Sequence, residues 1–123
     1  MRERRKRKDP RARMRATATV VRLQYATDSA PEVSRTVTCR ITDISIGGIR
    51  ISADWQMPFE TPLKVTVMFK SPPAHFHPIG RVRWVQRSSE PDRFLTGIEF
   101  TEKDEETLAA WREFLQERYP ELA

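Results

Sequence analysis

Residues 36–52, TVTCRITDISIGGIRIS, decide the fold of this 123-residue chain. Residues 36–42 alternate polar and apolar side chains, and so do residues 48–52, as expected for strands with one buried face. Between them, residues 43–48 combine Asp and Ser, which bond nearby backbone groups, with two glycines that allow a positive φ. The stretch therefore predicts two strands joined by a tight, bulged turn.

Four further segments alternate with the same period of two, and turn residues separate them. They are residues 16–25, 63–69, 80–86 and 94–100. Turn chemistry lies at residues 26–34, and a Pro- and His-containing loop is expected at residues 71–78. Six short strands predict an all-β fold, a six-stranded antiparallel β-barrel over residues 16–101, because closure leaves no exposed strand edge.

Helical spacing replaces strand alternation near the C-terminus. Residues 101–104, TEKD, resemble a capping box in which Asp replaces Glu. Leu108, Trp111 and Leu115 then recur at the spacing of one helix face. We therefore expect a C-terminal helix over residues 102–119 whose apolar face packs on the barrel, within a single domain.

The net charge of +5 is concentrated at the N-terminus. Residues 1–15 contain nine Lys and Arg against two acids, a net +7, whereas residues 16–123 contain thirteen against fifteen, a net −2. Residues 1–15 lack apolar periodicity, and Pro10 cannot donate a backbone hydrogen bond, so a flexible basic arm is predicted. Such an arm indicates an anionic partner, although a solvated tail has the same composition.

The composition also restricts location. No apolar run approaches the ~20 residues of a membrane span, and the basic N-terminus lacks the apolar stretch of a secretory signal. A soluble, cytoplasmic protein without a membrane partner is expected. Cys39 is the single cysteine and lies in a predicted strand, which favours a buried structural thiol in a reducing compartment.

Enzymatic signatures are missing from the sequence. His75 and His77 are the two histidines, and neither a cysteine nor an acid lies near them in sequence to complete a metal site. The chain also has no Gly-rich phosphate loop, serine elbow or helical histidine pair. We expect a protein that is not an enzyme and has neither a metal nor a cofactor.

Two groups of residues indicate a nucleotide ligand. The Asp43 carboxylate is an acceptor suited to the adjacent N–H donors of guanine, the Ser45 hydroxyl can donate or accept, and Gly48 permits close approach. In the arm, Arg7 and Arg11 have the R-x-x-x-R spacing, and arginine contacts guanine or phosphate oxygens through two bonds. The spacing also fits Arg11 with Arg15, so the register stays open.

The order of these features resembles the PilZ domain family. Arg7 and Arg11 match its R-x-x-x-R motif, and Asp43, Ser45 and Gly48 match its D/N-x-S-x-x-G motif. The resemblance covers essentially the whole chain. It implies a six-stranded barrel that binds the bacterial second messenger cyclic di-GMP, with the arm folded over the ligand.

The resemblance also implies a receptor that changes its arm conformation on binding and so regulates a partner protein of unknown identity. Lys6 lies where the family's stoichiometry tends to be set, so one or two cyclic di-GMP molecules per site remain open. Two other hypotheses remain. One is nucleic-acid binding by the arm, disfavoured because Trp55, Trp84 and Phe94 are not interleaved with the basic run. The other is a ligand-independent interaction adaptor.

Overall fold

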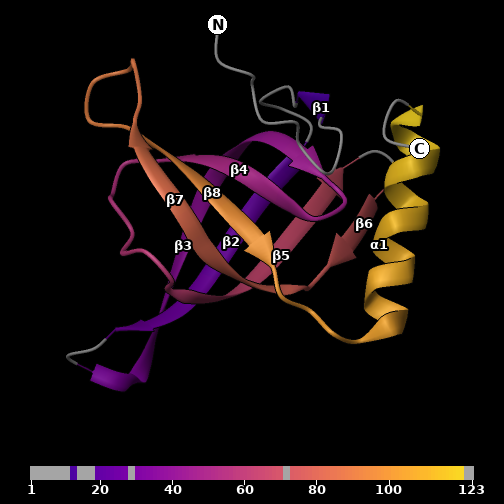
Figure 1. The fold of residues 1–123 in the computed structure, drawn as a ribbon, viewed down its shortest axis with the longest axis horizontal. Coiled ribbons are helices and arrows are strands. Elements are labelled where there is room, and N and C mark those ends of the chain that lie inside the picture. Colours follow the sequence, from indigo (N-terminus) through magenta and orange to yellow (C-terminus); the bar gives the residue numbers. More distant parts are fainter. Residues whose placement is uncertain (1–11, 14–18, 28–29, 71–72, 121–123) are drawn as a thin grey trace, which may run out of the picture.

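Six antiparallel strands form a closed barrel in the computed structural model, which describes residues 12–13, 19–27, 30–70 and 73–120. The strands are β2 (Thr19–Thr27), β3 (Ala30–Ser45), β4 (Gly48–Ala53), β5 (Pro62–Lys70), β7 (Ile79–Arg87) and β8 (Phe94–Phe100). They are ordered β3-β2-β5-β7-β8-β4, and β4 pairs back with β3 to close the ring (Figure 1). The predicted six-stranded antiparallel barrel is confirmed.

Two short strands add to this barrel. β1 (Ala12–Arg13) pairs with β3, and β6 (Pro73–Phe76) pairs with β5. The prediction of a loop over residues 71–78 is therefore wrong for these four residues. β7 pairs with β5 only as far as Lys64, so the second half of β5 has a free edge that β6 covers. The turn expected over residues 26–34 is also shorter, because β2 extends to Thr27 and β3 begins at Ala30.

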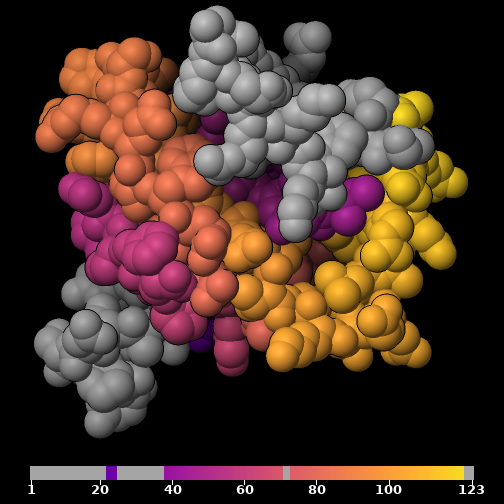
Figure 2. Space-filling model, viewed as in Figure 1, coloured from indigo at the N-terminus to yellow at the C-terminus, as the bar shows by residue number. Residues whose placement is uncertain are grey.

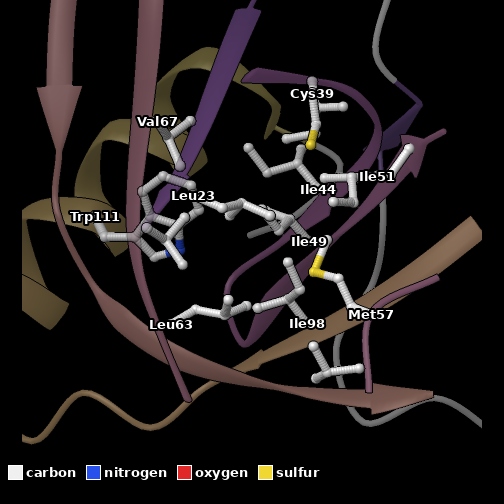
Figure 3. Packing of buried hydrophobic residues seen from close by; sticks show 14 of the residues in the cluster. Leu23, Cys39, Ile44, Ile49, Ile51, Met57, Leu63, Val67, Ile98 and Trp111 are labelled. Carbon is white, nitrogen blue, oxygen red and sulfur yellow. The ribbon is translucent and has the colours of Figure 1, made fainter. Parts of the chain in front are cut away.

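The core fills the barrel with aliphatic side chains that alternate along the strands. The four residues predicted to share one face of β5 are all buried: Leu63, Val65, Val67 and Phe69. Leu23 from β2 and Ile49 and Ile51 from β4 meet them inside the barrel (Figure 3). Cys39 also lies in this core, as expected, and burial raises the pKa of its thiol to about 11.

Helix α1 (Glu105–Arg118) lies beside β6 and forms one flank of the molecule (Figures 1 and 2). Trp111 and Leu115 are buried against the barrel, which confirms the predicted apolar face. The Trp111 ring lies 5.3 Å from both Phe76 and Phe100, and the Phe114 ring lies 4.6 Å from Phe69. Tilted and edge-to-face aromatic pairs of this kind join the helix to β5, β6 and β8.

The helix begins three residues later than predicted. Asp104 is the N-cap, and its side chain accepts hydrogen bonds from the Thr107 amide (2.9 Å) and hydroxyl (2.7 Å). The first helical bond runs from the Leu108 amide to the Asp104 carbonyl at 3.0 Å, whereas Thr101 still belongs to the ladder between β8 and β7, where its amide donates to the Ile79 carbonyl at 2.9 Å. The capping sequence was recognised, but the capping residue was assigned to the wrong end of it.

Replacing Asp104 with Ala is expected to lower the unfolding temperature, while Thr101→Ala leaves it unchanged. The two bonds from Thr107 lower the pKa of Asp104 below its ordinary 3.8, so folding favours the ionised carboxylate. The difference in unfolding temperature between wild type and Asp104→Ala should reach its largest value above about pH 3.8. It should shrink as the pH falls through the lower pKa of Asp104 in the folded state. Thermal unfolding across pH measures this, and an equal loss in Thr101→Ala would contradict the assignment.

Candidate functional site

The turn between β3 and β4, residues 43–48, lies where the barrel closes, and we call it the motif turn. A β-bulge between Ile41 and Asp43 shifts the alternation of β3 by one residue. Beyond the bulge, Ile44 is fully buried in the core. Asp43, its neighbour, is therefore on the outer face, opposite Arg50 of β4.

Two rows of residues cross this outer face, because residues directly opposite each other on neighbouring strands share a face. Each row takes one residue from β3, β4, β8 and β7 in turn. The first row is Asp43, Arg50, Gly97 and Trp84, and the second is Ser45, Gly48, Glu99 and Arg81. The predicted ligand residues Asp43 and Ser45 therefore begin two adjacent rows on β3, and Gly48 lies next to Ser45 on β4.

Asp43 forms an ion pair with Arg50. Both Nε and Nη2 of Arg50 contact the same carboxylate oxygen, Oδ2. The Thr42 hydroxyl lies 3.2 Å from Oδ2 and 3.1 Å from the Arg50 carbonyl oxygen. Asp43 is 6% exposed, so its charge has lost most of its contact with water. The bonds to Arg50 and Thr42 compensate for this loss.

Ser45 is held in a single orientation by its own turn. Its hydroxyl donates to the Gly48 carbonyl oxygen at 3.1 Å, and the residue is 6% exposed. A hydroxyl has one hydrogen and two lone pairs. With that hydrogen used inside the turn, Ser45 Oγ can offer a ligand acceptor sites only.

Gly48 is required by the packing of the barrel itself. A Cβ atom at this position would lie 2.2 Å from the Ile98 carbonyl oxygen of β8. The positive φ that the two glycines allow is not used, because neither Gly47 nor Gly48, both of them described residues, has one. Close approach of β8, rather than an unusual backbone conformation, explains this glycine.

The motif turn is tied to the rest of the molecule by two carbonyl groups. The Trp111 indole Nε1 of α1 donates to the Ile46 carbonyl oxygen at 3.0 Å. The Phe100 amide at the end of β8 donates to the Gly47 carbonyl oxygen at 2.9 Å. A buried tryptophan needs such an acceptor, so the packing of α1 and the position of the turn depend on each other.

β1 brings one part of the basic arm to the motif turn. Ala12 pairs with Ile44, and Arg13 pairs with Asp43. The expectation that residues 1–15 lack regular structure is wrong for these two residues. The other residues predicted for the arm's part of the site lie outside the described residues; these are Lys6, Arg7, Arg11 and Arg15.

A family model described as the PilZ domain matches residues 5–117, which include both motifs. The chain belongs to the PilZ domain family. The match covers the barrel and nearly all of the C-terminal helix, so it confirms the resemblance drawn from the two motifs. No curated protein sequence gives a match.

Solved structures with the same fold include the PilZ domain of another protein. The inhibitor of motility MotI/DgrA of Bacillus subtilis is 15% identical, with a TM-score of 0.70 over 98% of this chain and 55% of that one. MrkH of K. pneumonia in complex with c-di-GMP is 18% identical, with a TM-score of 0.73 over 95% and 54%. The PilZ domain of YcgR from Escherichia coli with c-di-GMP is 12% identical, with a TM-score of 0.69 over 95% and 94%.

This PilZ chain spans about half the length of MotI and of MrkH, and nearly all of the YcgR domain. Identities this low establish the common fold alone.

Sequence reasoning did not place Arg50 and Trp84 in the outer row that contains Asp43. Arg50 lies between two buried isoleucines of β4, which is a readable signal for an outward side chain, but its partner depends on the bulge. A Cβ atom at Gly97 would lie 2.3 Å from the Trp84 indole, so the indole covers this glycine. That contact joins two strands and has no local signature.

The two histidines, at which no metal site was expected, lie on the surface of this PilZ domain. His75 and His77 are exposed, and the Thr66 hydroxyl lies 3.3 Å from Nδ1 of His77. Among the described residues, no group of three His, Cys, Asp or Glu side chains is arranged to hold a metal ion. No helix in the described part of the chain is both long and apolar enough to span a bilayer.

Gly48→Ala is expected to destabilise the barrel by about 1–3 kcal/mol, because its Cβ meets backbone that has to move. Gly97→Ala serves as the comparison, since its Cβ meets the Trp84 side chain. Adding Trp84→Ala should recover part of the stability lost in Gly97→Ala, whereas no side-chain truncation relieves Gly48→Ala. Urea unfolding measures each free energy, and a neutral Gly48→Ala would contradict the steric explanation.

Proposed function

We propose that this PilZ domain is a receptor for cyclic di-GMP. The observation that carries the proposal is the pairing of Arg13 with Asp43, which brings the two described residues of the basic arm next to the D-x-S-x-x-G motif. The family membership supports it, as do the complexes of MrkH and of the YcgR PilZ domain with c-di-GMP.

Acceptors of the motif turn suit the base of this ligand. Guanine offers two neighbouring donors, N1–H and the exocyclic amine, on its Watson–Crick edge. Ionised Asp43 is an acceptor only, and Ser45 Oγ can only accept once its hydrogen is given to the Gly48 carbonyl. The proposed role of Asp43 and Ser45 is therefore to read the two donors of guanine, with Gly48 permitting close approach.

The arm supplies the charge that the phosphates require. In the proposal, Arg7 and Arg11 clamp the guanine and the phosphates, and Arg11 with Arg15 is the alternative register. Ordering the arm costs roughly 1–2 kcal/mol of backbone entropy per fixed residue. The arginine contacts have to exceed this cost, so we expect affinity no better than sub-micromolar from one bound nucleotide. In the same proposal, the residue at position 6, Lys6, determines whether one or two cyclic di-GMP molecules bind per site.

A change in the arm is the proposed output. Folding of the arm over the ligand would alter the surface next to β1 and thereby the contact with a downstream partner protein. The motif turn also bonds to α1 through the Ile46 carbonyl and Trp111. This bond offers a second surface, that of the helix, at which a partner could sense the ligand.

Isothermal titration of cyclic di-GMP into the full chain tests the proposal. Arg11→Ala is expected to weaken binding at least tenfold, since a bidentate charged contact is lost. Arg112→Ala removes an equal charge from the exposed face of α1 and should bind like wild type. Comparison of Arg7→Ala with Arg15→Ala identifies the register of the motif.

Absence of heat from wild-type protein at tens of micromolar would remove the receptor proposal. Binding that is equal in wild type and Arg11→Ala would remove the role of the arm. A polynucleotide titration with steep salt dependence, in the absence of any response to cyclic di-GMP, would favour nucleic-acid binding by the arm instead.

A further inference from the structure

Asp43 uses one of its two carboxylate oxygens within the protein. Nε and Nη2 of Arg50 and the Thr42 hydroxyl all approach Oδ2. Among the described residues, none donates to Oδ1. Within the described part of the chain, the carboxylate is thus held through Oδ2 alone.

We propose that Arg50 is a positioning residue of the nucleotide site, which fixes Asp43 through Oδ2 so that Oδ1 alone reads the ligand base. The proposal rests on the function proposed above. Arg50 lies directly opposite Asp43 in the β3–β4 register, and the bulge before Asp43 creates that pairing. Its place is therefore set by the sheet rather than by a flexible loop.

The strength of the ion pair favours a ligand that binds without breaking it. The Arg50–Asp43 pair combines hydrogen bonds with the attraction between two opposite charges. A neutral guanine that displaced Arg50 could replace the hydrogen bonds but not that attraction, and it would leave a guanidinium without its carboxylate. Contact with Oδ1 avoids this loss, because the pair stays intact.

Arg50 also has capacity beyond Asp43. Its side chain is 25% exposed, and no described residue accepts a hydrogen bond from its Nη1. A guanidinium carries five N–H donors in a fixed plane. The outward part of the same group is therefore available to a phosphate while Nε and Nη2 hold Asp43.

This arrangement gives the site two single acceptors, Asp43 Oδ1 and Ser45 Oγ, one for each donor of guanine. Inosine keeps N1–H but lacks the exocyclic amine. The cyclic dinucleotide of inosine should therefore lose one contact with a charged or polar acceptor. Such a loss corresponds to about a ten- to hundredfold weaker affinity.

Titration of cyclic di-GMP and cyclic di-IMP into wild type, Arg50→Gln and Arg40→Gln tests the proposal. Wild type should prefer cyclic di-GMP by about ten- to a hundredfold. Arg50→Gln should bind cyclic di-GMP about tenfold more weakly and lose most of that preference, because a mobile carboxylate no longer presents Oδ1. Arg40→Gln is the matched control, since Arg40 also lies on the β3–β4 pair but bonds to Glu90, and it should behave as wild type.

A double-variant cycle adds a readout that general destabilisation would not give. If Arg50 acts through Asp43, then Arg50→Gln should weaken cyclic di-GMP binding much less in an Asp43→Ala background than in wild type. Thermal unfolding shows whether each variant is folded. If Arg50→Gln does not fold, Arg50→Lys keeps the charge with a single donor group, and its preference for cyclic di-GMP should fall in the same way.

Three results would overturn the proposal while the receptor function stands. Equal weakening of both ligands in Arg50→Gln would assign Arg50 a structural role. Tighter binding by Arg50→Gln would mean that Arg50 competes with the ligand for Asp43. Unchanged binding and preference would remove Arg50 from the site. Wild type that binds neither ligand would reject the receptor function itself, and this proposal with it.

Discussion

The close approach of β4 to β8 at Gly48 is the constraint on which the structure depends. With the Ile98 carbonyl oxygen 2.2 Å from the place of a Cβ, a side chain here would push apart the two strands that complete the barrel. The same glycine lies opposite Ser45 and closes the hairpin that carries Asp43. The D-x-S-x-x-G pattern is thus a requirement of the fold at its glycine and a candidate for ligand recognition at its Asp and Ser.

Charge on the outer face of the barrel is balanced within the face. Asp43 pairs with Arg50, and Glu60 and Glu99 share Arg81 and Arg83 at distances of 3.1 to 3.7 Å. These three acids and three arginines leave little net charge to attract an anion. The excess positive charge of the chain lies in residues 1–15. The arm therefore has to supply the long-range attraction for an anion, while the barrel supplies selective short-range contacts.

Local patterns predicted the strands, the barrel and the C-terminal helix, because alternation and helical spacing depend on residues near one another in sequence. They failed where a residue's role depends on the pairing of strands. The pattern marks Thr101 as a cap, yet Thr101 continues the ladder to Ile79, and the bulge that places Arg50 opposite Asp43 has no local signature. The motif positions Asp43, Ser45 and Gly48 were readable from the sequence, whereas the donors and acceptors that orient them were not.

The motif turn also links this barrel to the helix at its side. Ile46 and Gly47 each turn a carbonyl outward from the hairpin, and these two groups are satisfied by Trp111 of α1 and by the Phe100 amide. A buried acceptor that loses its donor costs about 1–3 kcal/mol. A ligand that displaced the turn would have to break these bonds or carry Trp111 and the end of β8 with it. Trp111 is also packed against Phe76 and Phe100, so one side chain joins the turn to β6, to the end of β8 and to the helix.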